Sequence, residues 1–447
     1  MKSTQSLNNR ERVLLVGVGL KKSAHGLPGA PWTTGRESLE ELGELAVSAG
    51  AEISGTMLQV REALDPATLV GKGKLEEIRS EANARKVPLV IVDHNLTPVQ
   101  LRNMEKGIGK RVIDRTQLIL DIFAVHARTR EGQLQVELAQ LNYLLPRLTG
   151  RGEELSRLGG GIGTRGPGEQ KLETDRRRIR ARVAKIQQAI ETVRRQRATR
   201  RTARQAVPLG MVALVGYTNA GKSTLFNALT HAEVLTSSKM FATLDPTIRS
   251  VRLPSHRRVL LSDTVGFVRD LPPDLIAAFR ATLEEAQEAA LILHVTDISN
   301  PHHAEQDAEV LKVLADLGVQ DRPRLHVLNK IDSLSEEEVT ELKKANGNGN
   351  SHSVFVSAQT GEGLQDLLRR IDEVMPFDPL VRLRLYVPTS DGRTLSMVHA
   401  SGRVLHHEIS DGHFVLDAEI PQSLCRRLEE FTHKSSDAKP EPPSVHA

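Results

Sequence analysis

Residues 211–223 read Met-Val-Ala-Leu-Val-Gly-Tyr-Thr-Asn-Ala-Gly-Lys-Ser, and this stretch decides the fold expected around it. Its first five residues are apolar enough for a buried strand, and a helical segment, 224–230, follows. The pattern Gly-x4-Gly-Lys-Ser between a strand and a helix is the context of a phosphate-binding loop. Glycine lets the backbone curl so that its N–H groups face phosphate oxygens, and the helix N-terminus adds a favourable dipole. Lys222 is expected to reach the β- and γ-phosphates, and the Ser223 hydroxyl to ligate Mg²⁺.

A second motif, Asp263-Thr-Val-Gly266, follows the apolar segment 259–262. We expect Asp263 to hold Mg²⁺ through water and the Gly266 N–H to sense the γ-phosphate. By itself, the pattern Asp-x-x-Gly is weak evidence for a GTPase. It becomes strong here because it lies at the end of an expected strand, downstream of a phosphate-binding loop.

The third motif predicts which base is bound. Asn329-Lys-Ile-Asp332 follows the expected strand 324–328. The Asp332 carboxylate can accept two hydrogen bonds, one from guanine N1–H and one from the exocyclic amine. Adenine lacks this pair of donors, so it would leave the carboxylate unpaired. Ser357-Ala358, after the next expected strand, is expected to place a backbone N–H on guanine O6.

Strands that alternate with helices predict an α/β fold with parallel sheets in two parts of the chain. Residues 1–115 are expected to form an N-terminal α/β domain, and residues 207–375 a doubly wound P-loop GTPase domain. The expected strands are 12–20, 52–60, 87–92 and 111–114 in the first part, and 211–215, 259–262, 291–296, 324–328 and 353–356 in the second. The expected helices of the first part are 38–49, 67–86 and one that begins at Pro98.

Residues 116–206 are expected to form a basic antiparallel helical hairpin. Leucines from Leu134 to Leu148, spaced 4, 3, 4 and 3 apart, form the apolar seam of one helix. We expect that helix to begin as early as Thr116 and to end or kink near Pro146. A second seam runs from Leu172 to Val193, after a glycine-rich tip at 158–168.

The positive charge of the chain is concentrated in this hairpin. Residues 151–206 carry 16 Lys and Arg against 6 Asp and Glu, although the net charge of the whole chain is only +4. Such a block is the electrostatic footprint of a protein that binds a polyanion. A glycine-rich tip flanked by arginines, among them Arg176-Arg177-Arg178, fits a probe inserted into structured RNA. The alternatives are a solvated helix face or a linker between domains.

The end of the chain predicts a small α+β domain at 376–433 and a disordered tail at 434–447. Its expected elements are strands at 380–387, 394–400 and 413–420 and a helix at 421–432.

Composition argues against several other classes of protein. The only cysteine, Cys425, leaves no disulfide framework and no Cys-based metal site. The adjacent pairs His302-His303 and His406-His407 are not expected to chelate one ion together. No apolar run approaches the roughly 18–20 residues of a membrane helix, and the polar N-terminus does not look like a signal peptide. We therefore expect a cytoplasmic protein without a membrane span.

Four segments together resemble the HflX family of GTPases, which is related to the translation factors. They are 216–227, 241–247 (Phe-Ala-Thr-Leu-Asp-Pro-Thr), 263–267 (Asp-Thr-Val-Gly-Phe) and 160–169 (Gly-Gly-Ile-Gly-Thr-Arg-Gly-Pro-Gly-Glu). The last lies outside the expected GTPase domain and is highly specific. The resemblance covers roughly residues 12–431, but is loose in the C-terminal domain.

The resemblance implies further roles and a partner. Thr243 would be the switch threonine whose hydroxyl completes the Mg²⁺ shell, although spacing alone also allows Thr247. The family binds the large (50S) ribosomal subunit, and some members split or rescue stalled ribosomes under stress. The basic hairpin would then contact ribosomal RNA, with an affinity that falls steeply with salt.

The full expected site contains three groups of residues, around GTP or GDP and Mg²⁺ in a monomeric protein. The catalytic group is Lys222, Thr243 and Gly266, and the magnesium ligands are Ser223, Thr243 and Asp263. The nucleotide-binding residues are Gly216, Tyr217, Thr218, Asn219, Ala220, Gly221, Lys222, Ser223, Thr224, Phe241, Ala242, Thr243, Leu244, Asp245, Asp263, Thr264, Val265, Gly266, Asn329, Lys330, Ile331, Asp332, Ser357, Ala358 and Gln359.

One position bears on the rate of hydrolysis. Many GTPases have a glutamine directly after Asp-x-x-Gly that orients the attacking water. Phe267 stands there in this chain, so hydrolysis by the protein alone is expected to be slow, and the ribosome to supply or order the missing group. Arg269 and Arg280 lie nearby in sequence, but neither is assigned as an arginine finger.

Two other functions remain open at this point. The chain could be an RNA-remodelling or assembly factor whose N-terminal domain binds a second nucleotide such as ATP, for which Gly71-Lys-Gly-Lys74 offers a phosphate contact or only a polar turn. It could also be a regulator that docks on another protein through the basic hairpin.

Overall fold

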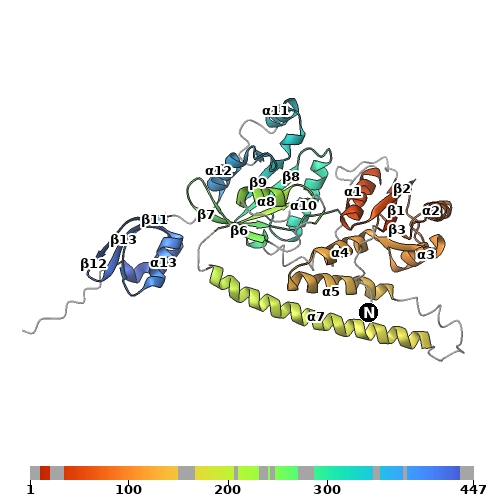
Figure 1. Ribbon diagram of the computed structural model, residues 1–447, viewed down its shortest axis with the longest axis horizontal. Helices are drawn as coiled ribbons and strands as arrows, with labels where there is room; N and C mark the ends of the chain where they lie inside the picture. The colour runs from red at the N-terminus through yellow and green to blue at the C-terminus, as the bar shows by residue number, and fades with distance from the viewer. Residues whose placement is uncertain are drawn as a thin grey trace, which may run out of the picture. The chain divides into compact units, whose positions relative to one another are not determined.

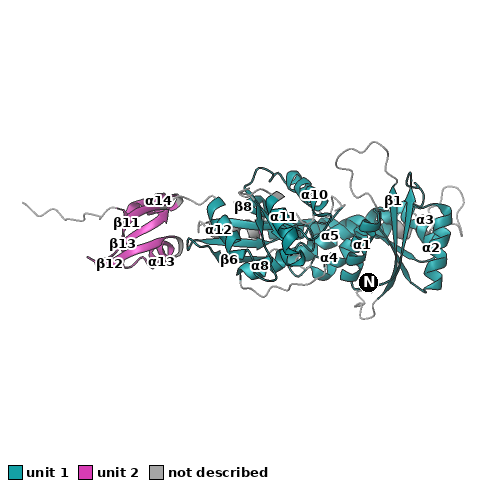
Figure 2. Cartoon of the chain, turned by 90° about the horizontal axis from the view of Figure 1, so that it is seen from above, with its two compact units in different colours: residues 1–194, 211–374 teal, residues 195–210, 375–447 magenta. Residues whose placement is uncertain are grey.

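The computed structural model describes residues 11–20, 35–148, 167–205, 210–230, 240–241, 247–269, 286–345, 353–375 and 380–432. The chain divides into two compact units, Met1–Arg194 with Met211–Val374 and Arg195–Gly210 with Met375–Ala447 (Figure 2). Among these described residues, no helix is long and apolar enough to cross a membrane. The expected tail, 434–447, lies outside them.

The first sheet has the order β2-β1-β3-β4, and all its strands are parallel, as expected. Its strands are β1 (Arg12–Leu20), β2 (Glu52–Arg61), β3 (Leu89–Val92) and β4 (Arg111–Asp114). Successive side chains of a strand point to opposite faces. Val13 and Leu15 of β1 therefore join one hydrophobic core, while Leu14 and Val16 join another on the opposite face. The apolar run of β1 is thus explained by burial on both sides.

Helices cover both faces of this sheet (Figure 1). Residues of α1 (Gly35–Ser48) and α4 (Arg115–His126) pack on one face, and those of α2 (Lys72–Ala84) and α3 (Pro98–Ile108) on the other. The boundaries of α3 follow from local chemistry. The Thr97 hydroxyl accepts a hydrogen bond from the Gln100 N–H at 3.2 Å, Pro98 opens the first turn, and Gly109 ends the helix at φ +71°.

The expected single helix from Thr116 is wrong, because the segment forms two helices. α4 ends at His126, and the extended backbone of the next residue, Ala127 (φ −66°, ψ 109°), breaks the helical path. The Thr129 hydroxyl then accepts a hydrogen bond from the Gly132 N–H at 3.0 Å and starts α5 (Arg130–Arg147). α4 belongs to the N-terminal core, and the leucine seam lies on α5 alone.

The helices α5 and α7 (Pro167–Gln205) lie side by side (Figure 1). Leu134 of α5 is buried against Ile186 and Ile190 of α7, with further apolar residues around them. At the rim of this contact the Arg182 guanidinium donates two hydrogen bonds to the Glu137 carboxylate, at 2.7 and 2.8 Å. Part of each predicted seam therefore takes part in this contact, while the residues of the glycine-rich tip before Pro167 lie outside the described part of the chain.

The second sheet has the order β10-β9-β8-β5-β7-β6. Its strands are β5 (Met211–Gly216), β6 (Thr247–Arg252), β7 (Arg258–Asp263), β8 (Leu291–Asp297), β9 (Arg324–Asn329) and β10 (Ser353–Phe355). The five expected strands are present and parallel, and the unexpected β6 runs antiparallel to β7 at the edge. Its helices include α8 (Lys222–Thr230), α10 (His303–Asp316), α11 (Glu336–Ala345) and α12 (Leu364–Val374). The mixed α/β fold with parallel sheets is thus confirmed.

The second unit contains an antiparallel sheet of order β11-β13-β12. Its elements are β11 (Leu380–Pro388), α13 (Gly392–Ser401), β12 (Arg403–Ser410), β13 (His413–Pro421) and α14 (Gln422–Leu428). The strand expected at 394–400 is wrong, because this segment is α13. The Asp391 carboxylate accepts a hydrogen bond from the Thr394 N–H at 3.1 Å and caps that helix. The unexpected strand β12 has mostly exposed side chains, so it lacks the apolar signal of a strand.

The packing of α5 on α7 leads to a first prediction. Replacing Ile186 with Ala should remove buried contacts and lower the free energy of local opening of these helices by about 2–4 kcal/mol. Hydrogen–deuterium exchange of the peptides in α5 and α7 measures this change. Lys185→Ala, at an exposed neighbouring position, is the control. Equal protection in the Ile186→Ala variant and the wild type would contradict the packing described.

Candidate nucleotide-binding site

The motif residues gather at one edge of the second sheet. The phosphate-binding loop follows β5, Asp263 ends β7, Asn329 ends β9, and Ser357 lies just after β10. Because these four strands are parallel, their carboxyl ends meet at the same edge, where doubly wound sheets bind ligands. The segments placed there are Gly216–Thr224, Asp263–Gly266, Asn329–Asp332 and Ser357–Gln359. Of the expected residues Phe241–Asp245, the structure describes Phe241, and Ala242, Thr243, Leu244 and Asp245 lie outside the described residues.

The loop after β5 needs glycine at Gly221. The backbone of Gly221 has φ +91°, and a Cβ there would lie 2.3 Å from the side-chain nitrogen of Asn329. Any larger residue would push the loop away from the strand that carries the guanine motif. Asn219 also has a positive φ, +62°, which asparagine tolerates better than most residues.

Asn329 joins the two halves of the site. Its side-chain Nδ2 donates to the Ala220 carbonyl of the phosphate loop at 2.8 Å. Its Oδ1 accepts from the Ala358 N–H at 3.0 Å. One buried amide therefore fixes the phosphate loop against the segment expected at guanine O6, a role that sequence reasoning did not assign to it.

Lys222 is buried within the loop. Its Nζ donates to the Gly216 and Tyr217 carbonyls at 3.1 and 2.7 Å. Burial lowers the pKa of Lys222 to about 8, and the negative charge of Asp263 offsets this only in part. A phosphate group would stabilise the charged ammonium, so this lysine is suited to pair with an anion.

The oxygens expected to hold magnesium lie together. The Ser223 hydroxyl donates to the Asp263 carboxylate with an Oγ–Oδ2 distance of 2.7 Å. A hydroxyl and a carboxylate are hard oxygen donors of the kind that Mg²⁺ prefers. Their position beside the phosphate loop fits a magnesium ion shared with the phosphates.

The guanine motif is held by a sharp turn. Lys330 has φ +67°, and its Nζ lies 2.7 Å from the Asp297 carboxylate at the end of β8. This ion pair fixes the turn, and Asp332 follows in the 3₁₀ helix Ile331–Ser333 with an exposed side chain. The carboxylate can therefore meet the edge of a base. Asp297 was missed by sequence reasoning because no motif marks it.

Phe267 does not point its ring toward solvent. The side chain is only 3% exposed and lies in the hydrophobic core. Its backbone binds the phosphate loop, since the Thr218 N–H donates to the Phe267 carbonyl at 2.7 Å and the Phe267 N–H donates to the Gly216 carbonyl at 3.1 Å. The residue therefore ties the Asp-x-x-Gly segment to the loop.

Tyr217 connects the phosphate loop to helix α1 of the N-terminal domain. Its hydroxyl donates to the Glu41 carboxylate at 2.6 Å and accepts from the Arg269 N–H at 2.8 Å. Arg115, which is 2% exposed, lies 2.8 Å from both Glu41 and Asp93. Burial alone would lower the pKa of Arg115, but these two carboxylates raise it, so the guanidinium stays charged. These five residues, from distant parts of the sequence, thus form one largely buried network beside the loop.

The segment before Thr243 also contacts the N-terminal helices. The Met240 N–H donates to the Ser48 hydroxyl at 2.8 Å. The buried ring of Phe241 lies 4.5 Å from that of Phe123 on α4, measured between centroids. The expected switch segment therefore begins at a contact with the N-terminal domain.

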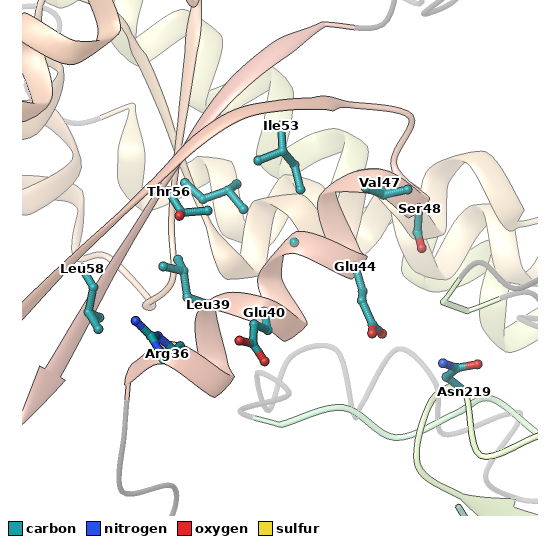
Figure 3. Close-up of a pocket in the computed structure, with 12 residues that line it drawn as sticks. Arg36, Leu39, Glu40, Glu44, Val47, Ser48, Ile53, Thr56, Leu58 and Asn219 are labelled. Atoms are coloured by element: carbon teal, nitrogen blue, oxygen red, sulfur yellow. The ribbon is translucent and has the colours of Figure 1, made fainter. Parts of the chain in front are cut away.

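A pocket of about 850 Å³ lies beside this contact. Side chains of α1 and β2 surround it, with Asn219 of the phosphate loop at one end (Figure 3). Glu40 and Glu44 line it together with one arginine, Arg36. Burial raises the pKa of Glu44, and Glu41 adds to the effect. Its acidic lining makes this pocket a poor site for the phosphates of a second nucleotide. The segment Gly71-Lys-Gly-Lys74, which was expected to be a phosphate contact or a polar turn, lies elsewhere and forms the N-cap and the start of helix α2.

Comparison with known proteins gives consistent matches along the chain. Residues 36–124 match a family described as GTP-binding GTPase N-terminal, residues 126–204 its middle region, and residues 211–330 a family described as 50S ribosome-binding GTPase. A protein named GTPase HflX from Caldanaerobacter subterraneus is 46% identical over 88% of this chain and 90% of its own. GTPase HflX of Escherichia coli is 43% identical over 88% of this chain and 92% of its own. A GTP-binding protein of Sulfolobus solfataricus, solved with GDP, is 24% identical over 82% of this chain and 98% of its own, with a TM-score of 0.43.

The buried lysine leads to a prediction about pH. Because phosphate stabilises the ammonium form of Lys222, GTP binding should take up a proton when the pH exceeds the pKa of about 8. The affinity should then weaken by up to about tenfold per pH unit, whereas near pH 7 the lysine is already charged and uptake is small. Calorimetry in two buffers of different ionisation enthalpy measures the proton count. The absence of uptake at about pH 8.5 would contradict the described state of Lys222.

The exposed carboxylate of the guanine motif leads to another prediction. Asp332→Asn should weaken GTP binding by about 100-fold and favour xanthosine triphosphate, because the amide donates where guanine N1–H also donates. Competition binding with both nucleotides measures the change. Glu336→Gln, an exposed carboxylate at the start of α11, is the control. Unchanged GTP affinity in Asp332→Asn would show that another residue recognises the base.

Proposed function

The chain belongs to the HflX family of GTPases, and from this premise we propose that it is a Mg²⁺-dependent switch that binds the large ribosomal subunit. The enzyme hydrolyses GTP to GDP and phosphate. The observation that carries the proposal is the position of Asn329, whose side chain holds the phosphate loop and the segment around Ala358 together. A triphosphate and a guanine base would then be bound at the same edge of one sheet.

The residues at this edge would act by position and charge. Lys222 would bind the β- and γ-phosphates, and the Gly266 N–H would contact the γ-phosphate. Ser223, Asp263 and Thr243 would hold Mg²⁺, which neutralises the charge that develops on the transferred phosphoryl group. No covalent intermediate with the protein is needed for this reaction.

Phe267 supports an activator outside the chain. A buried phenyl ring cannot orient the attacking water, which a glutamine does in many GTPases. Hydrolysis by the protein alone would be slow, and the ribosome would supply or order the missing group. The match of residues 211–330 to a family described as 50S ribosome-binding GTPase supports this choice of activator.

The basic helix α7 supports a contact with ribosomal RNA. Arg177, Arg178 and Arg180 are exposed, and the side chain of Arg178 is 78% exposed. Clustered exposed arginines bind phosphates and release counterions, so their contribution to binding depends steeply on salt. The surface of α7 would therefore anchor the protein, while the nucleotide site controls the strength of the complex. Ribosome splitting, rescue or biogenesis under stress would be the outcome.

The contacts of the phosphate loop with the N-terminal domain suggest how the switch is transmitted. Tyr217 binds Glu41, and Met240 and Phe241 contact α1 and α4 immediately before the switch threonine. A γ-phosphate that orders the segment around Thr243 would change these contacts. The N-terminal domain would thereby respond to the bound nucleotide.

The first experiment measures GTP hydrolysis with and without purified 50S subunits, at low and high salt. Strong stimulation that declines with salt is expected. The double substitution Arg177→Glu and Arg178→Glu should weaken subunit binding about tenfold or more at low salt and reduce the salt dependence, with unchanged hydrolysis in the absence of subunits. Arg369→Glu, an exposed arginine on α12, is the matched control.

Three other outcomes would each contradict a different part of the proposal or reveal a folding defect. No stimulation by 50S subunits would leave the GTPase intact but remove the ribosome as its activator. Stimulation that survives both the double substitution and high salt would remove α7 as the anchor. Loss of hydrolysis without subunits would indicate a folding defect in the variant, which circular dichroism detects.

A further inference from the structure

A cluster of two histidines and one aspartate lies in the GTPase domain, apart from the residues assigned to the nucleotide. His294 is on β8, His326 on β9 and Asp307 on α10. His294 and His326 are direct partners in the parallel pairing of β8 with β9, so both side chains project to the same face. Their rings stack with centroids 5.0 Å apart.

The three side chains converge on a small volume. The Nε2 atoms of His294 and His326 lie 3.1 and 3.2 Å from the two carboxylate oxygens of Asp307. One nitrogen of each histidine and one oxygen of the aspartate all lie within 4.8 Å of one another. The Thr296 hydroxyl donates to Asp307 Oδ1 at 2.6 Å and lies 2.8 Å from His326 Nε2. Five polar atoms thus lie close together.

The arrangement leaves one nitrogen unsatisfied. His294 is only 3% exposed, and its Nε2 has no hydrogen-bond partner among the described residues, because its approach to Asp307 lacks the geometry of a hydrogen bond. A buried polar atom without a partner costs free energy unless something else binds it. Two imidazole nitrogens facing one carboxylate could share a cation instead of two separate protons.

We infer that His294, Asp307 and His326 form a binding site for one divalent transition-metal ion, with zinc as the preferred ion. Zinc takes imidazole and carboxylate ligands at about 2.0–2.2 Å, which places neighbouring ligands of a tetrahedral site roughly 3.3 Å apart. Each histidine nitrogen lies at about this distance from one oxygen of Asp307, 3.1 Å for His294 and 3.2 Å for His326, and the three ligand atoms lie within 4.8 Å of one another, so a small contraction would bring them around one ion. Water or the Thr296 hydroxyl would complete the shell. Mg²⁺ prefers oxygen ligands, so the ion used with GTP would not compete for the histidines.

An ion at this site would connect the sheet to its covering helix. β8 and β9 continue from the two histidines to Asp297 and Asn329, the strand ends that support the guanine motif. A metal bond to Asp307 would join α10 to both strands. The ion would therefore stabilise the domain beneath the guanine motif without contacting the nucleotide. Entry from solvent is open, because the His326 side chain is 32% exposed.

The test uses the full chain, stripped of metal by a chelator that is then removed, in a buffer with Mg²⁺. Titration with ZnCl₂ should show one equivalent bound at micromolar concentration or below, and the midpoint of thermal unfolding should rise by about 5 °C at a hundredfold excess over the dissociation constant. Titration with CoCl₂ should give the visible absorption bands of a low-symmetry site.

Two substitutions in the cluster and one control elsewhere test whether zinc binds at the cluster. His326→Gln and Asp307→Asn should lose the tight equivalent, the thermal shift and the cobalt spectrum. Both should still bind GDP, which shows that the domain is folded. His407→Gln removes an exposed imidazole on β12, in the second unit, and should bind zinc like the wild type. The proposal is overturned if both cluster variants bind zinc as the wild type does, which would mean adventitious surface binding only, or if the wild type binds none.

Discussion

The side-chain amide of Asn329 is the interaction on which the nucleotide site depends. It donates to the phosphate loop at Ala220 and accepts from Ala358, two segments that are far apart in the chain. The parallel sheet brings these strand ends to one edge, and the amide fixes the distance between them. It also explains Gly221, because only glycine leaves room for the Asn329 nitrogen. The segments predicted to bind the phosphates and the base are therefore linked through one side chain.

Local patterns predicted much of this architecture. Apolar runs at β1, β5 and β8 marked strands buried on both faces, and motif spacing placed Asp263 and Asn329 at strand ends. The wrong predictions of secondary structure lie where the local sequence pattern differs from the structure that the folded chain adopts. The helix 392–401 was taken for a strand because short apolar segments have no unique period, and α4 was merged with α5 because the break at Ala127 has no glycine or proline. The contacts of Glu41, Arg115 and Tyr217, and of the His294 cluster, depend on folding of distant segments and leave no trace in spacing.

The buried charge of Arg115 limits how the phosphate loop can move relative to the N-terminal domain. A guanidinium as buried as that of Arg115 is tolerated only because Glu41 and Asp93 pair with it. Glu41 also accepts the Tyr217 hydroxyl, so a shift of the loop would disturb a charge that has no access to water. The loop and α1 are therefore expected to move together. Met240 and Phe241, which precede the proposed switch threonine, contact Ser48 and Phe123, so this segment as well as the phosphate loop touches the N-terminal domain.

Through these contacts the N-terminal domain is expected to respond to the bound nucleotide. Hydrogen–deuterium exchange of the full chain, compared between GDP and a non-hydrolysable GTP analogue in the presence of Mg²⁺, measures this response. A nucleotide-dependent change in protection is expected in α1 and α4, in addition to the loops of the GTPase domain. A change confined to residues 211–375, with identical exchange in α1 and α4, would contradict this expectation.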